Sequence, residues 1–197
     1  MRKLLCVWIA LMLVFTVAAA ESAPETQAPA MVELNFIDFT LLIPEDIIGT
    51  VEQEMVNGSP FFVFFEDYDP NAAFNKNLNG VWTEELLDIE AVDPTQFVSM
   101  TIATVAQQYE SIGIAATDPM LYMAGLDEHD GKQALSQVYS LNLDYTGVGF
   151  DLQKTIYTMQ AIVPIEGVGT YTFTITTDDM ENIPVLMGVM ESIRWID

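Results

Sequence analysis

The chain is constrained most by three strand-like segments that follow one another in its C-terminal half. In the last of them, apolar side chains alternate with threonines, which is the period of a strand with one buried face. The segments span residues 133–145, 150–163 and 170–177, and the turns between them fall at 147–149 and 164–169. Strands joined by such short turns pair as an antiparallel meander. Any fold for this chain must therefore contain an antiparallel sheet.

Other strands and two helices are predicted around this meander. Strands are expected at residues 32–43, 51–56, 61–65 and 119–125, with a polar loop at 67–80 and a turn at 127–131. Asp93 and Pro94 are typical of a helix N-terminus, and apolar residues at three- and four-residue spacing predict a helix over 94–112. A second helix is expected over 181–193, with Pro184 in its first turn. This order predicts an α+β domain in which an antiparallel sheet of about six strands packs against helices.

The N-terminus has the pattern of a secretory signal peptide. Arg2 and Lys3 precede an apolar run of 17 residues from Leu4 to Ala20, and small residues stand where signal peptidase cleaves. The alternative is a membrane anchor, because a span needs about 17–25 apolar residues. No basic stop-transfer cluster follows the run. We therefore expect cleavage after Ala20, which makes residues 1–20 the signal peptide and leaves an extracytoplasmic protein without stable membrane insertion.

Cleavage would remove the only cysteine and leave a strongly acidic domain. Cys6 precedes the apolar run, whereas a lipoprotein cysteine follows it, so no lipid anchor is expected. Residues 21–32 are rich in Pro, Ala and Glu and predict a linker, and residues 33–197 are predicted to form a single domain. The mature chain has four basic and 29 acidic residues, a formal charge of −25. That charge excludes nucleic acid as a partner, and the lack of cysteine excludes disulfides and zinc–thiolate sites.

Two acidic segments are candidates for calcium binding. The first has the alternate spacing that opens an EF-hand loop, and it comprises Asp67, Asp69 and Asn71. Ala72 and Leu78 stand where that loop needs glycine and glutamate, so the sequence supports only a looser carboxylate site or an ordinary solvated loop. The second segment, residues 127–130, contains the only histidine, His129, and is equally typical of a hairpin turn. No cofactor is expected unless calcium binds at one of these loops.

No catalytic motif is present in the sequence. A Ser–His–acid triad would have to use His129, and no serine stands in a Gly-x-Ser-x-Gly elbow. A pair of carboxylates acting as acid and base is compatible with the composition, but sequence order does not reveal their separation. The threonines of residues 170–176 and the methionines of the last helix are interpreted as solvent-side and core residues. Catalytic, cofactor-binding and metal-binding residues are therefore left unassigned.

Three short and different motifs lie at the beginning, in the middle and at the end of the domain. They are residues 39–46 (FTLLIPED), 77–81 (NLNGV, after Pro70) and 190–195 (MESIRW). With the helix at 94–112 and the strands after it, they resemble the PsbP-like superfamily, which includes the Mog-type and DcrB-type proteins. Ile47 departs from the family pattern, which has an aromatic residue after the acidic pair. The resemblance implies an antiparallel sheet sandwiched by helices, a strand at 77–81, and an accessory or binding role without shared catalytic residues.

These observations predict a secreted, non-catalytic accessory or binding module. Its partner would be a protein or a small ligand that the sequence does not identify. One alternative is a calcium-dependent structural or adhesive domain that uses the acidic loops. A second alternative is a small carboxylate-dependent hydrolase.

Overall fold

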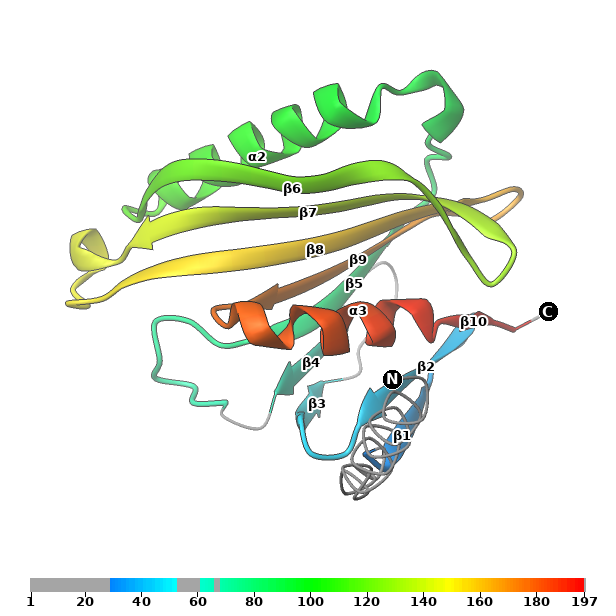
Figure 1. Cartoon of the computed structure of the whole chain (residues 1–197), viewed down its shortest axis with the longest axis horizontal. Coiled ribbons are helices and arrows are strands. Elements are labelled where there is room, and N and C mark those ends of the chain that lie inside the picture. The colour runs from blue at the N-terminus through cyan, green and yellow to red at the C-terminus, as the bar shows by residue number, and fades with distance from the viewer. Residues whose placement is uncertain (1–28, 53–60, 66–67, 197) are drawn as a thin grey trace, which may run out of the picture.

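A seven-stranded antiparallel sheet forms the centre of the structure, a computed structural model that describes residues 29–52, 61–65 and 68–196. In spatial order its strands are β3 (Ile48–Glu52), β4 (Phe61–Phe65), β5 (Asn77–Thr83), β9 (Gly169–Thr177), β8 (Gln153–Ile165), β7 (Lys132–Asp144) and β6 (Ala115–His129). Figure 1 shows β6 at one edge of this sheet and β3 at the other. Strands β6 to β9 are neighbours in chain order, which confirms the predicted meander.

Three sequence predictions within this sheet are wrong in detail. The polar loop predicted at 67–80 ends in β5, which pairs with β4 and β9 and agrees with the strand implied by the family resemblance. Pro164, predicted in a turn, lies near the end of β8 and pairs with Thr170. Strand β6 is also much longer than the predicted segment 119–125.

The strand predicted at 32–43 is in fact a hairpin of two strands. β1 (Met31–Asn35) and β2 (Phe39–Pro44) are antiparallel, and the Phe36 amide donates to the Phe39 carbonyl across the turn. The short strand β10 (Arg194–Trp195) pairs with the other side of β2 to complete a second, three-stranded sheet. β1 thus begins inside the segment predicted as linker, and the N- and C-terminal parts of the domain lie side by side (Figure 1).

Both predicted helices are present. α2 (Pro94–Ser111) begins where the Asp93 side chain accepts a hydrogen bond from the Gln96 amide, and the chain leaves it through Gly113 at a φ of 89°. Such a positive φ is readily adopted only by glycine. α3 (Ile183–Glu191) follows a short 3-10 turn, η3 (Met180–Asn182), and ends earlier than predicted because the chain enters β10. Two further 3-10 turns are η1 (Ile89–Ala91) and η2 (Thr146–Val148).

The helices cover opposite faces of the large sheet. Along β7, Tyr139, Leu141 and Leu143 join Val98 and Ile102 of α2 in one buried cluster. The alternate residues Ala134 and Val138 instead belong to the larger cluster that contains α3, β9 and β2. Because successive strand residues point to opposite faces, this division places α2 on one face and α3 with the small sheet on the other. The domain is therefore an α/β/α sandwich, as the resemblance implied.

The predicted signal peptide at 1–20, Cys6 and the predicted turn at 57–60 lie outside the described residues. In the part that the structure describes, neither helix has the length and apolar character needed to cross a bilayer.

Candidate functional site

The edge strand β6 exposes more large apolar side chains than any other described element. It is hydrogen-bonded to β7 on one side only. Five of its apolar residues are between 38% and 56% exposed, namely Met120, Leu121, Tyr122, Met123 and Leu126. Leu121 and Leu126 lie on the face that α2 covers, whereas Met123 lies on the face of α3, so apolar side chains are exposed on both sides of this edge. Scattered apolar residues are normal on a protein surface, but such a concentration along one edge strand is typical of an interaction surface.

The first half of β6 is irregular and the second half is regular. Its register against β7 shifts between Thr117 and Met120 and again between Leu121 and Met123, and Asp118 has a φ of 49°. Bulges and an edge proline, here Pro119, interfere with the addition of another strand. From Met123 to His129, in contrast, every residue pairs with β7 in one register. This run is the described part of β6 that is geometrically open to a further strand.

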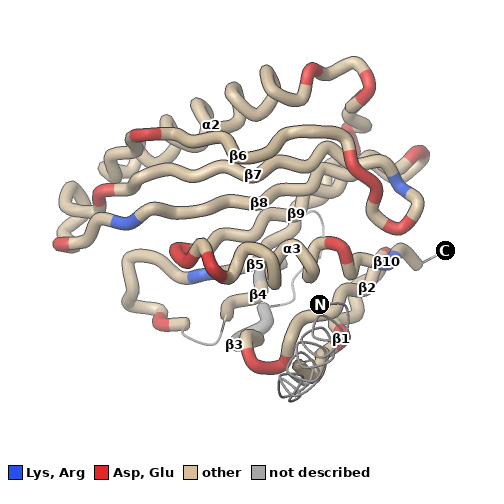
Figure 2. Tube along the Cα trace, viewed as in Figure 1, with Lys and Arg blue, Asp and Glu red and all other residues tan. Residues whose placement is uncertain are grey.

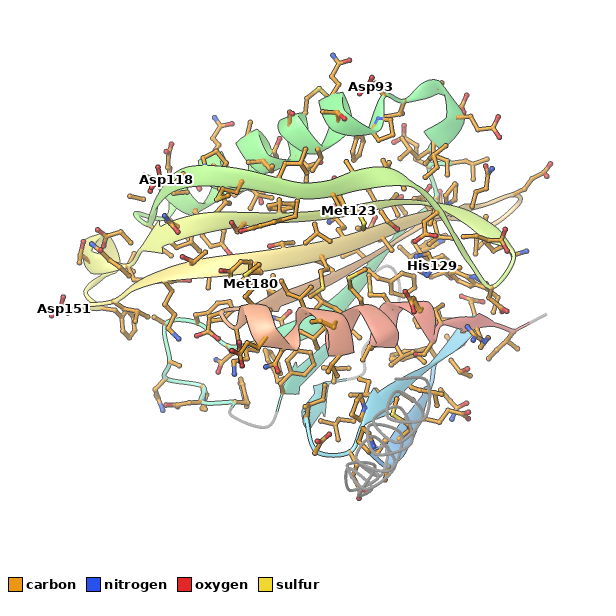
Figure 3. The ribbon with its side chains drawn as sticks, in the orientation of Figure 1. Asp93, Asp118, Met123, His129, Asp151 and Met180 are labelled. Carbon is orange, nitrogen blue, oxygen red and sulfur yellow. The ribbon has the colours of Figure 1, made fainter. Side chains whose placement is uncertain are left out.

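A cavity of about 30 Å³ lies between this run and α3. Met123 of β6 and Met159 of β8 both pair with Val138, so their side chains are on the same face of the sheet. Met187 and Met190 line the cavity from α3. The methionines of the last helix thus fill the core, as interpreted from the sequence, and also line a cavity. Figure 3 shows Met123 and His129 along β6, with α3 on the same side of the ribbon.

The polar end of the cavity contains a buried histidine. His129 is 4% exposed, its Nε2 lies 3.5 Å from Ser136 Oγ, and its Nδ1 has no hydrogen-bond partner. The carboxylate-bearing residues Asp127 and Glu191 also line this end. The predicted turn is shorter than expected, because only Asp130 and Gly131, both at positive φ, separate β6 from β7. His129 is therefore at the end of a strand rather than in a solvated loop.

The pairing of His129 with Ser136 was not foreseen, and it does not form a catalytic triad. Ser136 is buried, and a separation of 3.5 Å is long for activation of a hydroxyl. A triad also needs an acid on the second imidazole nitrogen, which is unpartnered here.

The opposite face of the sheet has a row of amide and hydroxyl groups. Gln137 donates to Gln160, whose amide donates to Thr174 Oγ1 over 3.0 Å. Asn77 donates to Thr176 Oγ1 over 3.0 Å. Thr174 and Thr176 are therefore half-buried members of a polar network, and Thr170 is buried, which corrects the interpretation of these threonines as solvent-side residues.

Carboxylates in both acidic loops accept hydrogen bonds from other residues of the chain. Asp67 lies outside the described residues, while Asp69 Oδ1 accepts hydrogen bonds from the Asn71 amide and side chain at 2.9 and 3.2 Å. Leu78, at the twelfth position of the EF-hand comparison, is buried in β5. In the second loop, Asp130 Oδ2 accepts from the Trp195 amide over 2.9 Å. Within residues 29–52, 61–65 and 68–196, no three His, Cys, Asp or Glu residues are grouped so as to hold a metal ion.

A central antiparallel sheet with a helix on each face and a small second sheet defines the PsbP-like fold. The solution structure of cyanobacterial PsbP (CyanoP) from Synechocystis sp. PCC 6803 is similar with a TM-score of 0.58 and 14% identity, over 90% of this chain and 99% of that chain. The crystal structure of the Ran-binding protein Mog1p from Saccharomyces cerevisiae is similar with a TM-score of 0.54 and 12% identity, over 86% and 97% of the two chains. No model of a known protein family matches the sequence, and curated proteins give no match either. The likeness establishes the fold, which agrees with the resemblance seen in the sequence.

Proposed function

We propose that this protein is exported and acts as a non-catalytic accessory module that binds another protein through β6. The observation that carries the proposal is the group of five exposed apolar residues along this edge strand. Mog1p, which has the same fold, is described as Ran-binding, so the fold is compatible with protein recognition. Export is supported by the N-terminal sequence, which has the charge and length pattern of a signal peptide.

A protein partner fits this surface better than a small ligand does. The cavity beside α3 is about 30 Å³, whereas pockets for drug-sized ligands are about 300–1,000 Å³. The exposed side chains follow the edge strand on both faces of the sheet, which matches a chain that binds along this edge. The buried Ser136–His129 pair lacks an acid partner, so the described residues favour binding over hydrolysis.

The proposal is tested by using the purified full-length chain as bait for extracytoplasmic proteins of its own cell. The informative variant is Met123→Lys with Leu126→Lys, which places charge on the exposed apolar surface. The matched control is Val148→Lys with Val168→Lys, because these two exposed valines lie in turns outside β6, and Val148 is beside Gly113, before the start of β6, rather than beside Met123 or Leu126. We expect the β6 variant to lose the partner and the control to keep it.

The dependence of capture on salt concentration distinguishes an apolar contact from an ionic one. Because burial of apolar surface is insensitive to screening, the part of the capture that depends on Met123 and Leu126 should persist at high ionic strength, even if binding to the acidic residues weakens. Equal capture by the wild type and the β6 variant would show that another surface binds. Capture that requires added calcium would instead favour the adhesive alternative.

A further inference from the structure

We propose that the run Met123–His129 of β6 binds an extended, basic segment of the partner as an eighth strand of the sheet, with a Lys or Arg side chain of that segment in the cavity beside α3. This inference rests on the proposed binding function and specifies its chemistry. It depends on three features of the edge: free backbone groups, a gap in the row of side chains, and unpaired acids.

The backbone of this run is available for pairing. In an antiparallel edge strand, alternate residues direct their N–H and C=O groups away from the neighbouring strand. At the end of this run two backbone groups are already used by side chains: the Glu128 amide donates to Asp127 Oδ1 over 2.8 Å, and the His129 carbonyl accepts from Trp195 Nε1 over 3.1 Å. From Met123 to Asp127, the backbone of the described strand forms no hydrogen bond beyond those with β7. The constant register from Met123 to His129 keeps these groups evenly spaced, as a partner strand requires.

Gly125 opens the cavity toward the edge. In the register with β7, it lies between Met123 and Asp127 on the face that α3 covers. A Cβ atom added at Gly125 would meet nothing within 4 Å. A side chain from a strand paired with β6 can therefore pass this position and reach the cavity.

The chemistry of the cavity fits a long side chain with a cationic end. Met123 and Met190 offer polarizable surface to an aliphatic stem. When Nε2 of His129 donates to Ser136, its unpartnered Nδ1 is an acceptor for an ammonium or guanidinium N–H. The volume of about 30 Å³ accommodates a group the size of a water molecule or an ammonium.

The charge around the cavity favours a basic segment. In the described part of the chain, no basic side chain lies within ion-pair distance of Asp127, Glu128 or Glu191. Figure 2 shows that acidic residues predominate at the β6–β7 hairpin, where Lys132 begins β7 and Arg194 lies 3.9 Å from Asp130. A second copy of this chain is a poor occupant of the edge, because each copy has a net charge of −23.

The test is selection from a phage-displayed library of random twelve-residue peptides on the purified full-length protein. We expect selected peptides to alternate apolar residues with Lys or Arg, and their binding to slow amide hydrogen exchange at alternate residues of 123–129. Gly125→Val closes the gap and suits a strand, and Asp127→Lys reverses the charge. Each should weaken binding about tenfold or more.

The matched control is Asp151→Lys, which makes the same change of charge at the other end of the sheet from His129 (Figure 3). It should leave binding unchanged, and thermal melts of all variants confirm that they are folded. Selected peptides that are acidic, that protect no β6 amide, or that bind Gly125→Val as tightly as the wild type would overturn the inference, as would a selection that enriches nothing. If the whole partner is nevertheless lost with Met123→Lys and Leu126→Lys, the proposed function stands without strand addition.

Discussion

Phe39 is the residue at which the aromatic rings of the core meet. It is completely buried and lies within 6 Å, between ring centroids, of Phe36, Tyr171, Phe173 and Trp195. Phe39→Ala should lower the free energy of unfolding by about 3–5 kcal/mol, because it removes these contacts and leaves a cavity. Urea denaturation measures the change.

The neighbouring variant Ile37→Ala is a suitable control, because Ile37 is 77% exposed. It should change stability by less than about 0.5 kcal/mol. Similar losses in the two variants would show that the ring cluster does not anchor β2.

Ionisation of Tyr139 should lower the stability of the fold at alkaline pH. Burial between α2 and the sheet raises the pKa of this phenol from 10.0 to about 12. Because the pKa of Tyr139 is higher in the folded state than in the unfolded state, its protonated phenol contributes fully to the free energy of unfolding below pH 10. This contribution is lost as the pH rises toward 12. We expect a loss of about 2–3 kcal/mol over this range.

Urea denaturation at several alkaline pH values measures this loss. Burial and a hydrogen bond to Asp38 also raise the pKa of Tyr171, so part of the alkaline effect should remain in Tyr139→Phe. An identical pH dependence in Tyr139→Phe and the wild type would argue against a role for Tyr139.

At the scale of elements, α2 depends on its N-cap. Asp93 Oδ1 accepts a hydrogen bond from the Gln96 amide over 2.8 Å. Asp93→Ala should lower stability by about 1 kcal/mol, whereas Asp93→Asn keeps an acceptor and should cost only a few tenths. Thermal denaturation compares the two variants, and an equal effect of both would indicate that the charge matters rather than the hydrogen bond.

Elements with local signals were predictable from the sequence, and α2 is the best example. Its cap, its apolar period and its terminal glycine all lie within about twenty residues of chain. β5 was misjudged as loop from its composition because asparagine usually marks turns. In the structure, the Asn77 side chain is satisfied by Thr176, a partner 99 positions away that no local pattern reveals.

The candidate site could not be predicted for a similar reason. Its components are the open edge of β6, the gap at Gly125 and the buried His129. They become a site only when strand order places β6 outermost and α3 beside it. The sequence contained one usable signal, the apolar run Met120–Met123 in a strand-like segment, which is exposed rather than buried.

At the scale of the whole molecule, uncompensated negative charge should oppose folding at low ionic strength. Among the described residues, three of the four basic side chains lie within ion-pair distance of an acid: Lys76 and Lys154 at Asp178, and Arg194 at Asp130. Most acidic residues therefore repel one another across the surface (Figure 2). Added sodium chloride should raise the melting temperature by screening this repulsion.

Differential scanning fluorimetry across a salt series tests this expectation. The control is the same series near pH 4.1, where the net charge is close to zero and the salt effect should largely disappear. If the melting temperature at neutral pH did not change with the concentration of sodium chloride, the acidic residues would be too far apart to repel one another measurably.

The pairing of β2 with β10 joins the beginning of the domain to its end. Ser192 accepts a hydrogen bond from the Leu42 amide and returns one to the Leu42 carbonyl, across 150 positions of chain. Ile193 and Trp195 complete the cluster around Phe39. A nascent chain therefore cannot complete this cluster until residues 192–195 have left the ribosome, so folding of the core has to wait for contacts that are very distant in sequence.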